Sequence, residues 1–410
     1  KINYKKINNC QISKDKNLEM LLSLGLIPPV NQMSRINQRP EEQLFFPTEI
    51  YYSKISKLVQ LGIAVDKEIL FPKSYPYTSS TTKNLRDNFF DLSKEIFKKF
   101  NVNKNDLIID IGSNDGNLLS NFKNKMRVLG ITPEQIGKVA ISRGIPTILK
   151  YFDYNLSNKI KKTYGKAKII TATNVFAHIE NVDSVLKSIK NILSDDGIFI
   201  SESHYLLSLI KNIQYDTIYH EHLRYYSLSS LQYLFSKHNL EIIFAKKIST
   251  HGGSIRVYAA KKNRYKIDKK LKELIRLEKI NLSLESLRKF KFKVIESKLR
   301  LYKLLSELKT KNNKIFGISA PSRATTLINY LGVSSDIITC ILEIEGSKKI
   351  GHYLPGTDIP IFNEKKLYKE QPEYALILSW HISEEIIANL KRKGFKGRFI
   401  IPLPIPKITK

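Results

Sequence analysis

The stretch YDTIYHEHLRYYS (residues 215–227) gathers several acid–base side chains in one short segment. Its candidate catalytic residues are Tyr219, His220, Glu221 and His222. A histidine with a pKa near neutrality can remove a proton, a neighbouring carboxylate can orient it, and a tyrosine hydroxyl can hold a developing oxyanion. Metal ligation by HEH is a second interpretation, although the HExxH spacing of a metal-binding helix is absent. A polar loop with satisfied histidines is the third, so these residues alone leave the choice open.

Two other segments place histidines where they could join the same site. In NVFAHIENVD, His178 follows an apolar stretch that we predict to be a strand. Active sites of open α/β sheets lie at the carboxyl ends of their strands, so His178 is expected at such an edge. STHGGSIRVYAA adds His251, Gly252, Gly253 and Arg256, in a glycine turn that suits close approach of a ligand.

The segment LIIDIGSNDGNLLSNF has the pattern of a strand, a glycine turn and the start of a helix. Gly112 and Gly116 would let the backbone approach a ligand, and Asp110 and Asp115 could accept hydrogen bonds from it. The spacing fits neither a P-loop nor GxGxxG, which favours S-adenosylmethionine (SAM) over a dinucleotide. A plain strand-to-helix connection without a ligand is the alternative.

Strands alternating with helices must position these groups. From Asp106 onward, apolar runs such as DLIIDIG, MRVLGI, AKIITATNVFAHI and GIFISESHY predict buried parallel strands, and residues 84–100 predict a helix. The alternation favours an α/β fold with an open, Rossmann-like sheet. The expected parts are a small irregular N-terminal module (1–80), a central α/β domain (81–263), a helical linker (264–310) and a second, C-terminal α/β domain (311–410).

Composition narrows the class of protein. The 410 residues carry a formal net charge of +30, but the basic residues are scattered and no nucleic-acid-binding motif accompanies them, so we expect no nucleic-acid partner. The sequence has no run of about 18 uncharged apolar residues, so we expect no membrane span. Only two cysteines, Cys10 and Cys340, are present, which fits a reducing cytoplasm. Nothing in the sequence determines the oligomeric state, and a monomer is the default expectation.

Seven segments, in order, resemble the SAM-dependent sugar C-methyltransferases of deoxysugar biosynthesis. They are FPKSYPYTSS, DIGSNDGNLL, NVFAHI, YDTIYHEHLRYYSLSSL, THGGSIRVY, APSRATTLINY and YLPGTDIPI. Those enzymes methylate a nucleotide-linked 4-keto sugar at the carbon beside the ketone. The resemblance implies a cytoplasmic transferase with SAM as cofactor and a nucleotide-linked keto-deoxysugar as substrate, feeding a surface glycan or a glycosylated natural product.

The same resemblance implies roles for individual residues. His222 would be the base, supported by Tyr219 and Glu221. His178 would line the pocket, together with Tyr75 or Tyr77, which the resemblance does not separate. The residues expected to bind SAM are Asp110, Gly112, Asn114, Asp115, Gly116, Thr132 and Asn174. The residues expected to bind substrate are His220, His251, Gly252, Gly253, Arg256, Ser322, Arg323 and Tyr353.

The chain departs from the family at the zinc site of the N-terminal module. The family binds zinc there through two CxxC pairs, whereas this chain has Cys10 with Ser13 and then Ser53 with Ser56. Serine hydroxyls are poor zinc ligands beside thiolates, and one cysteine cannot hold a structural zinc. We therefore expect no zinc and a module that depends on packing.

A second departure lies at Thr132, where the family has an acidic residue that accepts the ribose hydroxyls of SAM. Loss of a charged acceptor costs roughly 1.5–3 kcal/mol, or about a tenfold to hundredfold in affinity. We expect the side chain of Glu134 to point elsewhere, because alternate positions after a strand differ in direction. The SAM site thus lacks one acidic residue of the family, whereas the acid–base cluster is complete. This combination leaves two alternatives: a SAM-independent epimerase or isomerase of a keto sugar, or a non-catalytic nucleotide-sugar-binding homologue.

Overall fold

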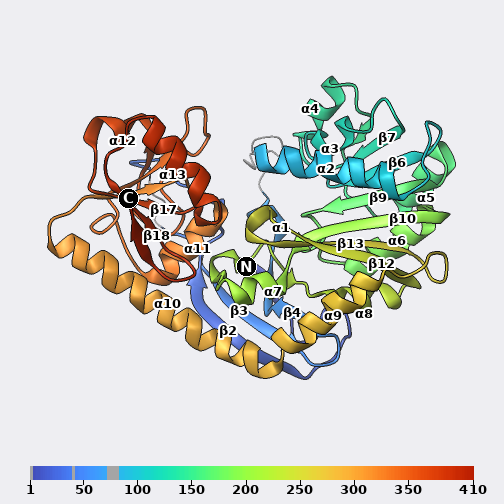
Figure 1. The fold of residues 1–410 in the computed structure, drawn as a ribbon, viewed down its shortest axis with the longest axis horizontal. Helices are drawn as coiled ribbons and strands as arrows, with labels where there is room; N and C mark the ends of the chain where they lie inside the picture. The colour runs from blue at the N-terminus through green and yellow to red at the C-terminus, as the bar shows by residue number, and fades with distance from the viewer. Residues whose placement is uncertain (1–2, 39–41, 72–82) are drawn as a thin grey trace.

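The computed structural model describes residues 3–38, 42–71 and 83–410 of the chain. Figure 1 shows two large lobes, with N-terminal strands between and beneath them. Each lobe is built on an open α/β sheet, so the α/β class with a second, C-terminal Rossmann-like unit is confirmed. Tyr75 and Tyr77, which we predicted to line the site, lie outside the described residues.

The central domain contains a seven-stranded sheet in the order β12-β13-β10-β9-β6-β7-β8. Pairing is parallel from β10 to β8, whereas β13 is antiparallel to both β10 and β12. The carboxyl ends of β6, β9 and β10 therefore meet at one edge. The strands are β6 (Leu107–Ile111), β7 (Arg127–Ile131), β8 (Thr147–Ile148), β9 (Ala167–Thr173), β10 (Leu193–His204), β12 (Leu240–Ile248) and β13 (Ser254–Lys261).

Helices cover both faces of this sheet, because successive side chains of a strand point to opposite sides. Ile108 packs in the core cluster with Phe89 of α2, whereas Ile109 packs in the cluster with Leu186 of α6. Each buried strand thus needs apolar residues at every position. The helices are α2 (Lys83–Lys99), α3 (Asn117–Ser120), α4 (Gly137–Ser142), α5 (Tyr154–Tyr164), α6 (Val182–Ile192), α7 (Leu206–Lys211) and α8 (Leu228–Ser236).

The N-terminal residues, expected to be irregular, form an antiparallel sheet in the order β11-β4-β3-β2. Alternating burial along β3 gives this sheet one buried face. Strand β11 (Arg224–Tyr225) belongs to the acid–base segment and pairs with β4, so the sheet holds that segment from outside the central domain. The other elements are β1 (Tyr4–Lys6), β2 (Leu18–Ile27), β3 (Phe46–Ser53), β4 (Val59–Leu61), β5 (Ile63–Val65) and α1 (Lys67–Leu70).

The C-terminal domain has a six-stranded sheet in the order β16-β15-β14-β17-β18-β19, parallel except for β19. Helices α9 (Lys269–Asn281) and α10 (Leu284–Thr310) link the lobes, and α10 runs beneath the C-terminal lobe in Figure 1. The remaining elements are β14 (Ile315–Ile318), α11 (Ser322–Leu331), β15 (Cys340–Glu343), β16 (Ile361–Asn363), α12 (Lys365–Glu370), β17 (Tyr374–Ile377), α13 (Ser383–Arg392), β18 (Arg398–Ile401) and β19 (Lys407–Thr409).

One core cluster joins the parts of the molecule. Leu22 of β2, Leu301 of α10 and Leu327 of α11 belong to the same cluster of buried residues. Burial of this shared apolar surface stabilises the arrangement of the N-terminal sheet against the C-terminal lobe. Within the described ranges, none of the helices has the length and apolar character to cross a bilayer.

Candidate active site

Four imidazole rings and one phenol ring gather at the carboxyl edge of the central sheet. His204 ends β10, and its ring centroid lies 5.1 Å from that of His222 and 5.6 Å from that of His251. The ring of His222 also lies 5.0 Å from His178 and 4.2 Å from Tyr219. The structure therefore brings together four residues selected from the sequence and adds His204 to them.

His222 has the hydrogen bonding of a general base. Its Nδ1 lies 2.8 Å from the carbonyl oxygen of Thr217, and since a carbonyl only accepts, Nδ1 carries the proton. Nε2 of the neutral ring then keeps a lone pair. Burial, with a smaller contribution from neighbouring His178, lowers the pKa of His222 to about 3. The ring is thus neutral near pH 7 and able to take up a proton at Nε2.

Tyr219, in contrast to the proton-accepting His222, is a hydrogen-bond donor. Burial raises the pKa of its hydroxyl well above the ordinary value, and the nearby Glu221 carboxylate raises it further. The phenol therefore stays protonated near neutral pH. A protonated phenol can donate a hydrogen bond to an oxygen that gains negative charge.

Glu221 does not hold His222, contrary to our expectation. Its carboxylate accepts a hydrogen bond from Nδ2 of Asn31 at 2.7 Å, from the segment that follows β2. Its main-chain carbonyl accepts a hydrogen bond from Nδ1 of His178 at 2.6 Å. The chain turns through this segment, so the adjacent Glu221 and His222 side chains have different partners. Glu221 orients His178 through its backbone, and the carbonyl of Thr217 orients His222.

Arg323 joins the C-terminal domain to the central domain. It lies in α11, and its Nε is 3.0 Å from Oδ2 of Asp216 in the acid–base segment. Trp380 Nε1 donates to the same oxygen at 2.7 Å, and Arg323 Nη1 donates to Nδ1 of His381 at 2.6 Å. Asp216 is fully buried. These contacts form a buried ion pair between the two lobes, where we had predicted a substrate contact for Arg323.

The glycine turn at Gly252 and Gly253 positions His251. Nε2 of Gln214 donates to the carbonyl of Gly252 at 2.6 Å, and a Cβ on Gly253 would lie 2.5 Å from Ser208 Oγ. The glycines therefore permit tight packing against the protein itself. His251 has a left-handed backbone with φ of 55°, which is uncommon for a residue with a side chain. Among the described residues, its buried Nε2 has no hydrogen-bond partner, so it is available to a ligand.

Arg256 lies in a buried network beside the site. Its Nε donates to Glu202 Oε2 at 2.9 Å, and its Nη2 donates to Asn88 Oδ1 at 2.6 Å. Asn88 Nδ2 in turn donates to Glu202 Oε1 at 2.9 Å. This network ties α2 to β10 and β13 near the strand end that carries His204. The structure thus places Arg256 among protein partners, where we had predicted a substrate contact.

His220 lies apart from the other imidazoles. Its Nε2 donates to the carbonyl oxygen of Pro47 at 3.2 Å and lies 3.0 Å from Thr48 Oγ1, both in β3. Its ring packs edge-on against Phe46. These contacts attach the acid–base segment to the N-terminal sheet.

Ser322 and Tyr353, also predicted to bind substrate, lie where the C-terminal domain meets the segment after β2. Ser322 Oγ is 3.4 Å from Asn31 Oδ1. The backbone amide of Tyr353 donates to the carbonyl of Ser34 at 2.8 Å. Asn31 also donates to Glu221, so it connects Ser322 to the acid–base segment.

The glycine turn after β6 contacts the turn that carries His178. Gly112 has φ of 77°, and a Cβ there would lie 2.3 Å from Val175 Cγ2. Gly116 also has φ of 77° and precedes α3. Thr171 Oγ1 donates to Asp110 Oδ1 at 2.6 Å, and burial raises the pKa of Asp110 to about 7, partly offset by that bond. The turn thus packs against the segment that carries His178.

Unsatisfied polar atoms at this edge fit the predicted cofactor. Of the residues described, Asn174 at the end of β9 and Asn117 at the start of α3 each have a buried polar side-chain atom without a hydrogen-bond partner. Such atoms cost free energy unless a ligand or water pairs with them. Asp115 is paired with Arg143 at 3.3 Å. A ligand with both donors and acceptors, as SAM has, would satisfy the asparagines.

Thr132 is enclosed by the protein, whereas Glu134 reaches the glycine turn. Thr132 is buried with 1% exposure, and its amide donates to the carbonyl of Ile148 at 3.1 Å. The Glu134 carboxylate, however, lies 3.4 Å from Nδ2 of Asn114 in the glycine turn. The expectation that Glu134 points elsewhere is wrong, because strand alternation does not apply once the chain bends into the turn before α4 (Gly137 N to Glu134 O, 3.1 Å).

The four positions that correspond to the family's zinc ligands do come together. Cys10 Sγ is 3.1 Å from Ser56 Oγ, and Ser13 Oγ is 3.4 Å from Ser53 Oγ. The amide of Ser13 donates to Cys10 Sγ at 3.4 Å. Hydrogen bonds and packing thus hold the two halves of this knuckle, which we define as Cys10–Ser13 and Ser53–Ser56.

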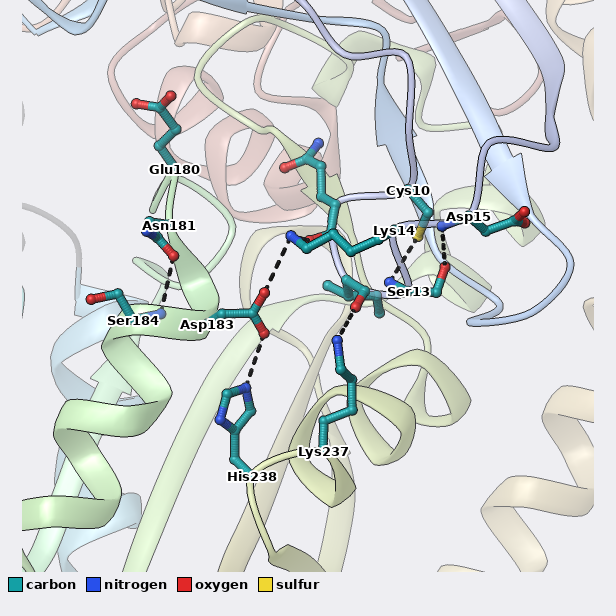
Figure 2. Close-up of polar contacts among 12 residues, drawn as sticks. Cys10, Ser13, Lys14, Asp15, Glu180, Asn181, Asp183, Ser184, Lys237 and His238 are labelled. Carbon is teal, nitrogen blue, oxygen red and sulfur yellow. Dashed lines mark hydrogen bonds and ion pairs between the residues drawn. The ribbon is translucent and has the colours of Figure 1, made fainter.

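Figure 2 shows how the knuckle is attached to the central domain. Asp183 lies between Lys14 and His238, at 3.2 Å from Lys14 Nζ and 3.0 Å from His238 Nε2. Lys237 Nζ donates to the carbonyl of Ile12 at 2.6 Å. These polar contacts join the knuckle to α6 and to the end of α8.

Replacing Ser13, Ser53 and Ser56 with cysteine is expected to create a Cys₄ zinc site together with Cys10. The side chains already face one another, and structural zinc binding is worth on the order of 10 kcal/mol. Metal analysis of the purified variant should find close to one zinc per chain. A variant that also carries Cys10→Ser is the control and should bind zinc far more weakly. Equal zinc contents in the two would contradict the prediction.

Sequence reasoning missed His204, His381, Asp216 and Trp380. His204 ends a predicted strand, so the argument used for His178 would have found it. No comparable signal exists for Thr217, because its contribution is a backbone carbonyl. Asp216 and Trp380 meet Arg323 only through contacts between lobes.

The buried imidazoles should make stability depend on pH. Burial lowers the pKa of His178, His204, His220, His222, His251 and His381 below the ordinary value. In the unfolded chain these histidines take up protons near pH 6.5, whereas in the folded protein they stay neutral to lower pH. Their contribution to the free energy of unfolding is therefore full above about pH 6.5 and is lost as the pH falls. Burial raises the pKa of three carboxyl groups, Asp110, Glu134 and Asp216, and these oppose the trend of the six histidines.

We therefore expect the free energy of unfolding, measured in urea, to fall steadily from pH 7 to pH 5. His204→Asn should flatten that slope by removing one protonating group. A stability that stays constant across this range would contradict the prediction.

Two family models match the chain. Residues 249–404 match the model described as a C-methyltransferase C-terminal domain, and residues 82–244 match the methyltransferase domain. The chain is also similar to C-methyltransferase NovU from Streptomyces niveus, with 28% identity over 98% of this chain and 97% of that protein.

Two solved structures resemble part of the chain. A SAM-dependent methyltransferase from Clostridium acetobutylicum ATCC 824 has 15% identity over 45% of this chain and 94% of its own, with a TM-score of 0.34. Magnesium protoporphyrin IX methyltransferase from Synechocystis PCC 6803, solved with bound SAM, has 12% identity over 42% and 78%, with a TM-score of 0.33.

Proposed function

Because the chain belongs to the SAM-dependent C-methyltransferase family, we propose that it methylates the carbon beside the ketone of a nucleotide-linked keto-deoxysugar. One observation supports this most directly: the neutral His222, held through Nδ1 by the carbonyl of Thr217, has its Nε2 available. A C–H group next to a ketone is a weak acid, and its deprotonation needs a positioned base of this kind.

In the proposed mechanism Nε2 of His222 takes the proton from the substrate carbon, and the C–H electron pair moves into an enolate. The protonated hydroxyl of Tyr219 donates to the enolate oxygen. When bound, SAM supplies an electrophilic methyl group. Asn117, Asn174 and the turn at Gly112 would hold it at the adjoining edge. The methyl–sulfur bond would break as the enolate carbon forms its bond to the methyl group, so S-adenosylhomocysteine would be the leaving group. The imidazolium of His222 returns its proton to solvent.

The test follows two labels, deuterium from solvent and the methyl group of SAM, in parallel reactions. The purified protein is incubated in D₂O with a nucleotide-linked 4-keto-6-deoxysugar, with and without methyl-labelled SAM. The proposal expects deuterium at the carbon beside the ketone without SAM and a labelled methyl group there with it. Deuterium uptake without methylation would favour the epimerase or isomerase, and absence of both would favour a non-catalytic binding protein.

A further inference from the structure

Three carboxylates lie near the glycine turn after β6, and two of them are bonded to the sheet or to an arginine. Asp110 accepts the hydrogen bond from Thr171 at 2.6 Å and lies within the sheet at 2% exposure. Asp115 is paired with Arg143 at 3.3 Å and accepts from the amide of Asn117 at 3.4 Å. A carboxylate already bonded to an arginine or to the sheet has little capacity left for a ligand.

Glu134 is the third carboxylate. Its hydrogen bond from Asn114 Nδ2 is long, at 3.4 Å, near the limit for such a bond. Burial raises the pKa of Glu134, and the bond from Asn114 only partly offsets the rise. A partly buried carboxylate with one weak donor gains stability from further donors, because its desolvation is not yet compensated.

The backbone explains why Glu134 rather than Thr132 reaches the turn. Thr132 follows β7 directly, and its methyl group packs so closely over Gly137 that a Cβ there would lie 2.6 Å from Thr132 Cγ2. Its side chain is therefore enclosed. The bend at Glu134 carries the longer side chain back toward Asn114, which has a left-handed backbone with φ of 49°.

We propose that Glu134 accepts hydrogen bonds from the two ribose hydroxyls of SAM, with Asn114 Nδ2 orienting the carboxylate. A vicinal diol presents two donors that a carboxylate can accept with both oxygens. The proposal rests on the proposed function, because it assigns a residue to the methyl donor. It removes the need for an acidic residue at Thr132 and makes SAM binding compatible with this sequence.

The experiment measures binding of S-adenosylhomocysteine (SAH) and of 2′-deoxy-SAH by calorimetry. In the unaltered protein, SAH is expected to bind at least about tenfold more tightly than the 2′-deoxy analogue. Glu134→Gln is expected to weaken SAH binding about tenfold to a hundredfold and to bring the two ligands close together in affinity. Glu384→Gln, the same change at an exposed glutamate of α13, is the matched control and should behave as the unaltered protein.

Each outcome decides the proposal. Unchanged SAH binding by Glu134→Gln would overturn it while leaving the proposed function intact. Weaker binding with the 2′-deoxy preference retained would also overturn it, because the effect would then be structural. Absence of SAH binding in the unaltered protein would overturn both. If Glu134→Gln fails to fold, Glu134→Asp, which keeps the charge on a shorter side chain, carries the same comparison of the two ligands.

Discussion

His222→Asn is expected to lower the rate of deuterium exchange at the substrate carbon by about a hundredfold to ten-thousandfold, the usual contribution of a general base. Asparagine can still donate to the carbonyl of Thr217 through its amide, as Nδ1 does now at 2.8 Å. What it lacks is the lone pair at Nε2. The loss should therefore fall on kcat for exchange and for methylation alike, with SAH binding unchanged.

The control for this variant is His238→Asn, at a histidine that follows α8 and is bonded to Asp183 of α6, outside the group of imidazoles. It should keep the exchange rate of the unaltered protein. A loss of less than threefold in His222→Asn would remove His222 from the role of base. His178→Asn would then be the next variant, since its Nδ1 is likewise bonded to a carbonyl.

Asp216→Asn is expected to destabilise the protein by about 3–5 kcal/mol, because it breaks a buried ion pair and leaves Arg323 without its counter-charge. The two side chains are nearly inaccessible, with 0% and 5% exposure. The change also alters the acceptor of Trp380 Nε1. Since these groups connect α11 to the acid–base segment, substrate chemistry should be lost together with the stability of the contact between lobes.

Chemical unfolding followed by Trp380 fluorescence measures this directly, because Trp380 is the single tryptophan of the chain. Asp195→Asn, at an exposed aspartate paired with Lys261, is the matched control and should have no measurable effect. A double variant with Arg323→Met should recover part of the loss, because it leaves no uncompensated charge. A cost below about 1 kcal/mol for Asp216→Asn would show that the pair does not hold the lobes together.

Local patterns in the sequence were sufficient for the fold class and for part of the site. Buried strands such as β6 are continuous apolar runs, and the glycines at 112 and 116 mark a turn that only residues tolerant of positive φ adopt readily. The apolar pattern of a strand and the geometry of a turn depend on residues that are neighbours in the chain. Both can therefore be predicted from the sequence.

The tertiary structure decided which partners the polar groups have. Arg323 and Asp216 are 107 residues apart, and Arg256 and Glu202 are 54 apart, so no local pattern links them. The orienting acceptor of His222 is a backbone carbonyl, which every residue possesses and no sequence pattern marks. Glu134 reaches Asn114 only because the chain bends after β7. Hydrogen-bond partners follow from where folding brings the backbone, and burial then sets the charge of each group.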